Sequence, residues 1–500
     1  MELLEAKGQG MVFTLIDLVS FFDREDIHDV ISTLYENGVN NSAVRLWFKL
    51  NQNTVIKVKT SAGLTDSAVV GDVIGQGTAG AALVSQLNLD YGLHNYFSGS
   101  ADELYYGQVR CEYVAYQDDI GKPSIGVNEA QAANIKLSNM FKEKGLEAHP
   151  DKTCFVVFGS PEYKDKITEQ LKENPLSLGD FPVKRREQDR YLGQILHTNG
   201  VQASCAATID DRAGKIKGAT FEVQSIVEDF KMQAIGGMMA AWVLWERALV
   251  PSLLSGAGTW TGITSTELDK LDGLQDLFWR VMFKVPESCP RIALRAETRM
   301  MSMKHRIWQY KLLLLKRIKG QSHETLSWKI WKEQRSNNWP GLSKEVSDIC
   351  NELNILDIND QDIPEGALKR AVFDHHLEEI KEKVSNSKKM MKHKEDNFQE
   401  VQDYMLDKNV EKSRMSFRIR CEMVPEVKGN FKDKHRRKGG EDALICNDCS
   451  NNEIQTQSHC VVCPKWDSFR SGLEMNKLDD LVIFFQRLLM EKTKGRSGST

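Results

Sequence analysis

A short apolar run that ends abruptly in an acidic residue constrains the fold of this chain more than any other feature. Residues 11–16 are almost continuously apolar, which is typical of a β-strand buried on both faces of a sheet. Asp17 ends the run, and an ionised carboxylate at such a position is costly unless it binds a metal ion or is paired. The following residues predict a helix that Asp23 would cap and Gly38 would end. Its apolar face would consist of Ile27, Val30, Ile31 and Leu34.

Two adjacent acidic residues, Asp118 and Asp119, stand at the tip of a predicted β-hairpin. Residues 114–116 before them are β-prone, so the segment predicts a strand, a tight turn and a second strand. Adjacent carboxylates repel one another unless a cation neutralises them, and Mg²⁺ prefers such oxygen ligands. Solvated turns also carry Asp-Asp pairs, so the pair alone leaves both interpretations open. Together with Asp17, three carboxylates could meet over two cations about 4 Å apart, as in phosphoryl and nucleotidyl transfer.

Five short motifs follow one another in a fixed order. They are the segment Asp17–Asp23, Gly75-Gln76-Gly77-Thr78, Tyr116-Gln117-Asp118-Asp119, Gly145-Leu146 with His149 and Lys152-Thr153, and Tyr191-Leu192-Gly193. In this order they resemble the palm motifs of reverse transcriptases of the non-LTR (LINE-like) retrotransposon family. The resemblance covers residues 10–200 strongly and residues 205–320 by general pattern. It implies an α+β palm of the right-hand polymerase fold and RNA-directed DNA polymerase activity.

The resemblance also implies how the chemistry would be divided among the acidic residues. Asp17 and Asp118 would bind two Mg²⁺ ions, with the backbone carbonyl of Leu18 as a further ligand. Asp119 would be a supporting carboxylate. The metals would lower the pKa of the primer 3′-hydroxyl and stabilise charge on the transferring phosphorus. Lys152 could protonate the departing pyrophosphate, although its residue type alone would equally suit an exposed surface lysine.

The substrate contacts are implied by the same resemblance. Phe22 stands where the family places an aromatic ring that excludes the ribose 2′-hydroxyl, although an aromatic residue here could simply be core. The other predicted substrate-binding residues are Gln76, Gly77, Tyr116 and Gln117. Gly77 would allow close approach of the backbone because it lacks a side chain. The expected partners are an RNA template, a DNA primer and deoxynucleoside triphosphates, and the family implies a nuclear location.

The chain departs from the family pattern in ways that affect the expected activity. Gly75 replaces a basic residue, and Gln117 and His149 stand where Ala and Asn are common. Only sixteen residues precede Asp17, too few for the fingers subdomain that grips the triphosphate in the family. We therefore expect a truncated product that binds metal and nucleic acid better than it polymerises. The alternatives are a catalytically incomplete nucleic-acid-binding remnant or scaffold, and an intron maturase-like protein that shares the palm.

A second group of metal-ligating residues lies towards the other end of the chain. Cys446, Cys449, His459 and Cys463 suit a closed tetrahedral Zn²⁺ site, since three thiolates and one imidazole are a common structural set. Cys460 is a possible substitute ligand, and buried reduced cysteines are the alternative. The spacing is similar to the Cys-Cys-His-Cys knuckle of LINE-like reverse transcriptases. The aromatic rings that follow, Trp466 and Phe469, would form a small core under the zinc or stack on bases.

Length and composition allow two to four domains in an ordinary globular chain. The 500 residues are 41% hydrophobic and 27% charged, with a net charge of only −4. Basic residues gather instead at 184–186, 388–394 and 428–438, where they could follow a phosphate backbone or form solvated faces. No signal peptide is evident. The most apolar stretch, 238–254, contains two charged residues and a proline, which favours a buried helix over a membrane span.

The pattern along the chain predicts five regions. Helical periodicity is clear after Thr264, which with Glu267 forms a capping-box signal. The predicted regions are a palm over 1–200, a helical thumb or extension over 201–320, a charged helical connection over 321–440, a zinc knuckle over 441–470, and a helix with a flexible tail over 471–500. Within the last region, residues 492–500 are predicted to be the tail.

Overall fold

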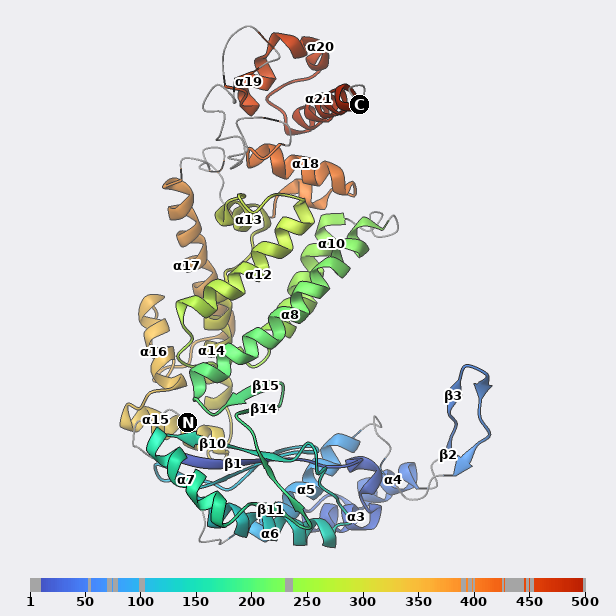
Figure 1. Ribbon diagram of the computed structural model, residues 1–500, viewed down its shortest axis with the longest axis vertical. Helices are drawn as coiled ribbons and strands as arrows, with labels where there is room; N and C mark the ends of the chain where they lie inside the picture. Colours follow the sequence, from blue (N-terminus) through green and yellow to red (C-terminus); the bar gives the residue numbers. More distant parts are fainter. Residues whose placement is uncertain are drawn as a thin grey trace. The chain divides into compact units, whose positions relative to one another are not determined.

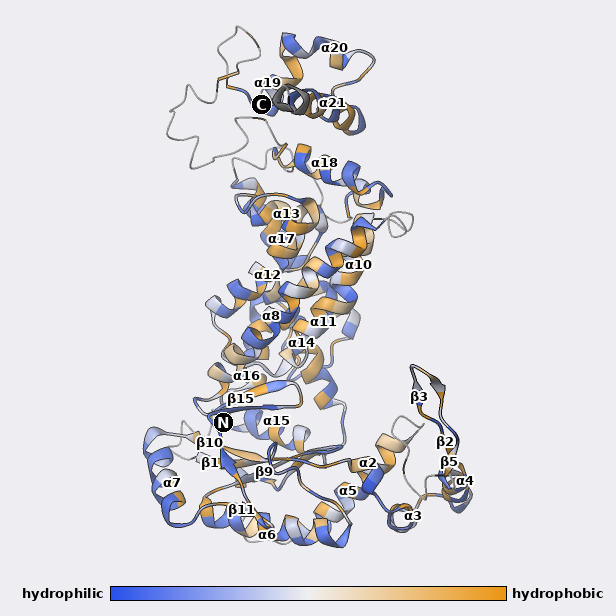
Figure 2. Ribbon diagram, turned by 45° about the vertical axis from the view of Figure 1, so that its right-hand side comes forward, coloured by the Kyte–Doolittle hydropathy of each residue, from blue (hydrophilic) through white to orange (hydrophobic). Residues whose placement is uncertain are grey.

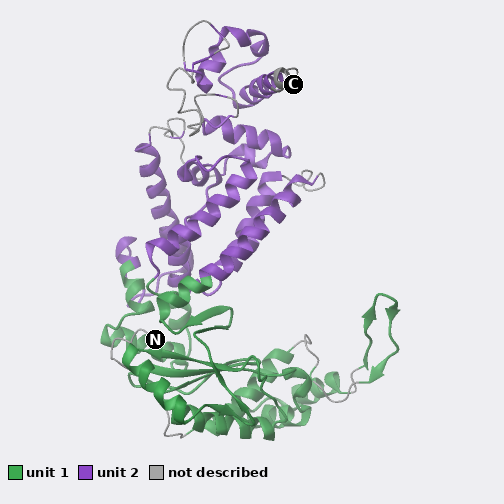
Figure 3. Ribbon diagram, viewed as in Figure 1, with its two compact units in different colours: residues 1–208, 260–262, 315–348 green, residues 209–259, 263–314, 349–500 purple. Residues whose placement is uncertain are grey.

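The protein is mixed α+β, mostly helical with a small sheet, and it divides into two compact units (Figure 3). The computed structural model describes residues 10–52, 55–69, 74, 80–98, 104–229, 237–387, 393, 398, 401–424, 427, 445–446, 449 and 454–497. Unit 1 comprises residues 1–208, 260–262 and 315–348. Unit 2 comprises residues 209–259, 263–314 and 349–500. In Figure 2 most helices carry both hydrophilic and hydrophobic colours, as expected for elements with one buried face.

A five-stranded sheet in the order β13-β10-β1-β9-β8 forms the centre of unit 1. Its strands are β1 (Gly10–Asp17), β8 (Val114–Tyr116), β9 (Asp119–Ser124), β10 (Cys154–Gly159) and β13 (Lys184–Arg185). Strand β1 lies between β9 and β10 and pairs antiparallel with both. Its burial on both faces confirms the strand predicted for residues 11–16 and explains why that run is apolar without alternation.

The two faces of the sheet are covered by different elements (Figure 1). On one face, Val12 and Ile16 of β1 pack into a core shared with the helices α5 (Ala81–Phe97), α6 (Val127–Glu143) and α7 (Pro161–Glu173). On the other face, Phe13 and Leu15 pack against the hairpin of β14 (Gln188–Tyr191) and β15 (Gln194–His197). Alternate residues of one strand therefore serve two separate cores, as the period of two requires.

The helix predicted after Asp17 is present, but a different residue caps it. Helix α3 (Ile27–Glu36) begins after Asp26, whose side chain accepts a hydrogen bond from the backbone N–H of His28 at 2.8 Å. Asp23, the predicted cap, lies instead in the short helix α2 (Phe21–Arg24). The prediction of the cap was wrong because α2 intervenes, so the acidic residue directly before the first buried position is Asp26.

Small elements complete unit 1. They are α4 (Asn41–Asn51), β2 (Val55–Ile56), β3 (Lys59–Thr60), β4 (Gly63–Leu64), β5 (Ala68–Val69), β6 (Leu104–Tyr106), β7 (Val109–Cys111), β11 (Ser177–Leu178), β12 (Phe181–Pro182) and α15 (Leu326–Asn337). Helix α15 lies against the β6–β7 hairpin although it is remote in sequence. Glu333 Oε1 accepts a hydrogen bond from the backbone N–H of Gln108 at 2.7 Å, and the Trp339 ring meets Tyr106 edge-on.

Unit 2 is helical. Its main helices are most of α8 (Val201–Glu228), α10 (Gly237–Leu244), α11 (Val250–Leu253), α12 (Ser265–Phe283), α13 (Arg291–Thr298), most of α14 (Met303–Lys319), part of α16 (Leu342–Glu352), α17 (Glu365–Ser385), α18 (Val410–Arg420), α19 (Gln457–Val462), α20 (Asp467–Arg470) and α21 (Leu478–Ser497). The predicted capping box of α12 is confirmed, with Thr264 and Glu267 each bonding the other's backbone N–H. The rings of Trp279, Phe283 and Phe417 stack within the core of this unit.

The apolar stretch 238–254 is helical, as predicted, and is buried along part of its surface, while other positions such as Val243 are exposed. It comprises α10, a π-helical turn over Trp245–Leu249 and α11, with Pro251 in the first turn of α11. Within the described part of the chain, no helix has the length and apolar content needed to cross a bilayer. Helix α21 continues to Ser497, so residues 492–497, part of the predicted tail, are helical.

Candidate active site

The predicted hairpin is confirmed, and its second strand sets one aspartate opposite another by pairing with β1. Strands β8 and β9 pair antiparallel, and the turn between them consists of Gln117 and Asp118. Strand β9 also pairs with β1, in a register that sets Asp17 opposite Asp119. The backbone N–H of Leu18 donates to the carbonyl of Asp118 at 3.2 Å, which ties the end of β1 to the turn. Backbone pairing therefore gathers the three acidic residues at one end of the sheet.

The turn that carries Asp118 is held from behind by a side chain of α5. Gln117 has a φ of 55°, in the left-handed region that non-glycine residues rarely adopt. Its backbone N–H donates to Oε1 of Gln86, and Nε2 of Gln86 donates to the carbonyl of Ala115 at 3.4 Å. One amide group thus satisfies two backbone groups of the hairpin. Sequence reasoning did not single out Gln86, because nothing in its local pattern distinguishes it from a solvent-facing helix residue.

The carboxylates affect one another electrostatically. Burial raises the pKa of Asp119, and the negative charges of Asp118 and Asp17 raise it further, while Lys152 partly opposes them. Lys152 Nζ lies 3.0 Å from Oδ2 of Asp17, and this hydrogen bond raises the pKa of the lysine. A site with three carboxylates and one ammonium group has an excess of negative charge. A divalent cation with oxygen ligands would neutralise that excess, so the donor set fits Mg²⁺.

The spacing of these carboxylates differs from that of a closed single-ion site. Among the described residues, three groups of His, Cys, Asp or Glu have all their ligand atoms within 4.8 Å of one another, and Asp17, Asp118 and Asp119 are not among them. The Asp17 carboxylate is instead paired with Lys152 Nζ at 3.0 Å. Ligands spread around two ions about 4 Å apart do not all need to lie that close to one another.

A cleft of about 330 Å³ opens beside the aspartates. Its lining includes Asp17, Asp119 and Lys152 on one side and the turn of the β14–β15 hairpin on the other. At that turn Leu192 and Gly193 have φ values of 48° and 73°, the pattern of a two-residue hairpin turn with both central residues left-handed. The Tyr191 hydroxyl donates to the carbonyl of Val114 at 2.9 Å, which connects this hairpin to β8.

Three polar residues of the cleft were not assigned to the active site from the sequence, although Arg186 belongs to the basic run 184–186. Arg186, Asp189 and Arg190 line it. Nη1 of Arg186 lies 2.7 Å from Oδ2 of Asp189, and the thiol of Cys154 donates to the same oxygen at 2.6 Å. Burial, followed by the Asp189 carboxylate, raises the pKa of Cys154 to about 12. These residues could have been predicted from their closeness in sequence to Tyr191, because neighbouring residues of a strand that reaches a site often line the site as well.

The predicted substrate-binding residues have mixed positions. Phe22 is half-buried and packs against Phe21 with ring centroids 5.3 Å apart, between two apolar cores. Tyr116 is exposed, and the Gln117 side chain is intermediate. Gln76 and Gly77 lie outside the described residues. The basic runs at 388–394 and 428–438 likewise fall almost wholly outside them.

The four predicted zinc ligands come together in unit 2. The ligand atoms of Cys446, Cys449, His459 and Cys463 all lie within 4.8 Å of one another, with Cys449 Sγ 3.4 Å from Nε2 of His459. His459 lies in α19, whose start Thr456 caps. Cys460 is buried but does not belong to the group. The chain's cysteines are all free thiols, so the group is held together by packing and not by disulfides.

The aromatic residues that follow the predicted zinc ligands form a small apolar core, which is one of the two roles predicted for them. Trp466 and Phe469 stack with centroids 5.4 Å apart. They belong to an apolar cluster that also contains Phe484, Phe485 and Leu488 of α21. The two rings therefore contribute to the apolar core of this region.

Comparison with known proteins does not identify a family for this chain. No family model matches the chain, and no curated protein matches it. Among solved structures, telomerase from Candida albicans, in a complex with the TWJ fragment of telomeric RNA, matches with a TM-score of 0.32 and 11% sequence identity. The match covers 70% of this chain and 49% of that one, so the chain spans about half the length of the telomerase chain. A likeness at this level does not establish a common fold.

Proposed function

We propose that this chain is a reverse transcriptase of the non-LTR retrotransposon type, which adds deoxynucleotides to a primer 3′-end on an RNA template. The observation that carries the proposal is the register that sets Asp17 of β1 opposite Asp119 of β9, with Asp118 at the adjoining turn. Carboxylates on a central strand and a neighbouring hairpin suit two-metal nucleotidyl transfer. The partners would be the template, a DNA primer and deoxynucleoside triphosphates, in the nucleus.

In this proposal each residue of the cleft has a distinct part. Asp17, Asp118 and the Leu18 carbonyl would hold two Mg²⁺ ions, which activate the primer 3′-hydroxyl and stabilise charge on the phosphorus. Asp119 would supply supporting negative charge. Lys152, hydrogen-bonded to Asp17 and half-exposed to the cleft, would donate a proton to the departing pyrophosphate. Phe22 would exclude the ribose 2′-hydroxyl, and Tyr116, Gln117, Gln76 and Gly77 would contact the substrates.

The Cys446, Cys449, His459 and Cys463 group is proposed to hold one structural Zn²⁺ ion. Support comes from the number and type of ligands and from their convergence around a single point. The ion would fix α19 against the apolar cluster beneath it. Cys446→Ser should remove about one zinc per chain, measured by elemental analysis of the purified protein.

Primer extension on an RNA template with deoxynucleotides and Mg²⁺ tests the polymerase. The wild-type chain should extend the primer, and the Asp118→Asn/Asp119→Asn double variant should lose at least about a thousandfold in rate, as when charge-stabilising groups are removed. Asp180→Asn, an exposed substitution in the same unit, is the matched control and should leave the rate unchanged.

A different result would favour the second interpretation. No extension by the wild-type chain, with template–primer binding retained in a filter or anisotropy assay, would mean that the protein binds nucleic acid without polymerising. Extension that survives in the double variant would refute the proposed site itself.

A further inference from the structure

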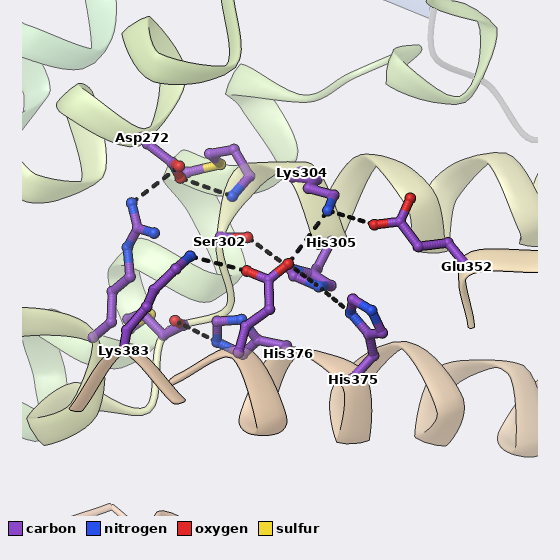
Figure 4. Close-up of polar contacts among 12 residues, drawn as sticks. Asp272, Ser302, Lys304, His305, Glu352, His375, His376 and Lys383 are labelled. Carbon is purple, nitrogen blue, oxygen red and sulfur yellow. Dashed lines mark hydrogen bonds and ion pairs between the residues drawn. The ribbon is translucent and has the colours of Figure 1, made fainter. Parts of the chain in front are cut away.

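Three metal-ligating side chains that the proposed function does not use converge in unit 2. His305 belongs to α14 and is fully buried. His375 and Glu379 belong to α17, where a spacing of four residues places both on one face of the helix. One nitrogen of each histidine and one oxygen of Glu379 lie within 4.8 Å of one another. Figure 4 shows the His305 and His375 side chains pointing toward each other from the two helices.

The His305 ring is held in one orientation. Its Nδ1 lies 2.7 Å from Oγ of Ser302, which leaves Nε2 facing α17. That Nε2 is 2.9 Å from Nδ1 of His375 and 3.9 Å from Oε1 of Glu379. In a metal-binding histidine, one ring nitrogen usually faces the metal and its other ligands, while the other nitrogen is hydrogen-bonded to a second group. His305 has this arrangement.

The Glu379 carboxylate is oriented in the same way. Oε2 is occupied by Lys383 at 3.0 Å, so Oε1 is the oxygen that faces the histidines. Lys304 lies 3.3 Å from Oε1, but it also pairs with Glu352 at 2.9 Å. Lys304 could therefore leave Oε1 and keep a partner. The two lysines lower the local negative charge, which favours a site with neutral imidazole ligands over one built from several carboxylates.

We propose that His305, His375 and Glu379 form a second metal site, which takes a Zn²⁺ ion with water as the fourth ligand. Two imidazoles and one carboxylate are a known three-residue set for zinc. Without metal, His375 Nδ1 is within hydrogen-bond distance of His305 Nε2. In the proposed site both of these nitrogens would bind the ion, and the proton of the His375 ring would be on its Nε2. The ion would join α14 to α17 independently of the Cys446 group and of the aspartates.

A third group of metal-ligating residues differs, because hydrogen bonds and ion pairs within the protein already occupy its carboxylate. Glu297, His393 and Cys421 also lie within 4.8 Å of one another. Arg420 Nε contacts both oxygens of Glu297, at 2.8 and 3.0 Å, and the Tyr404 hydroxyl donates to one of them at 2.5 Å. His393 Nε2 also contacts the Glu297 carboxylate, so this group is a buried ion-pair network. The His305 group differs because Lys304, the cation at Oε1 of Glu379, has a second partner in Glu352.

Metal content of the full chain tests the proposal without any measurement of polymerisation. The wild-type protein, loaded with Zn²⁺ and freed of excess, should contain two ions per chain by elemental analysis. His375→Gln and Glu379→Gln should each reduce the count to one, and Cys446→Ser should also reduce it to one. His376→Gln is the matched control, because its ring is buried beside the group but bonds the Met300 carbonyl at 3.1 Å, and it should keep two ions.

Cobalt substitution separates the two sites further. Co²⁺ at the Cys446 group should give an intense thiolate charge-transfer band, and His375→Gln should leave that band intact while the weaker visible bands fall. The inference is overturned if His375→Gln and Glu379→Gln, both shown to be folded by circular dichroism, keep the wild-type metal count, or if the wild-type chain binds only the ion that Cys446→Ser removes.

Discussion

A single amide side chain, Gln86, holds the turn that presents Asp118. It hydrogen-bonds backbone groups on both sides of Tyr116, and one of them belongs to the left-handed residue Gln117. Replacing Gln86 with Met keeps the volume but leaves both backbone groups without this partner. We expect the extension rate to fall about fivefold, since about 1 kcal/mol of lost hydrogen bonding would act on the position of the turn.

The control for this prediction is Gln52→Met, at an exposed position at the end of α4. It should leave the rate unchanged. A Gln86→Met protein with wild-type kinetics would mean that strand pairing alone positions the turn.

The raised pKa of Asp119 has a predictable sign for stability. The native carboxyl holds its proton to higher pH than the unfolded one, so its contribution to stability is full at low pH and is lost as pH rises through the native pKa. In metal-free buffer at pH 7, Asp119→Asn should therefore raise Tm, and the difference should vanish as pH falls below the ordinary carboxyl range.

Thermal melts from pH 3 to pH 8 check this, with Asp180→Asn as a control that should not shift Tm. Added Mg²⁺ should stabilise the wild-type protein more than the variant. A variant that is less stable than wild type in metal-free buffer would contradict the electrostatic account of the site.

At the scale of elements, the capping box of α12 is the clearest local determinant of unit 2. Thr264→Ala removes the hydroxyl that accepts the Glu267 N–H and should cost about 1 kcal/mol of the free energy of unfolding. Urea denaturation followed by circular dichroism measures the loss. Ser265→Ala, at the exposed next position, should change stability by less than half as much.

How far the sequence predicted these elements depends on where the signal lies. The strand at 11–16, the hairpin at Asp118 and the capping box were predictable because each is specified by a few neighbouring residues. The cap of α3 was wrongly assigned because α2 separates Asp23 from the helix. Gln86 could not be found from the sequence, since its role depends on how α5 packs against β8, which local periodicity does not record.

At the scale of the whole molecule, removal of zinc should affect one unit only. The Cys446 group rests on a small apolar cluster in unit 2, whereas the five-stranded sheet of unit 1 has a separate core. We expect a chelator selective for Zn²⁺, with the Mg²⁺ concentration held constant, to increase amide hydrogen exchange in residues 454–497 and to leave the exchange of β1, β9 and β10 unchanged.

Hydrogen exchange with mass spectrometry measures both regions in one experiment. Because the chelator would also empty the proposed His305 site, Cys446→Ser provides the control that isolates the cysteine group. Unchanged exchange at residues 454–497 in that variant would mean that packing alone maintains this end of the chain.

The hydrogen bond between Gln108 and Glu333 spans 225 residues of sequence. During synthesis, the β6–β7 hairpin leaves the ribosome long before α15 is made. The helices from α8 to α14, most of which belong to unit 2, are synthesised between them. Unit 1 therefore cannot be completed in the order in which it is translated. A nascent chain halted before residue 326 should present the hairpin to chaperones with no helix to cover it, while the sheet around Asp17 is already whole.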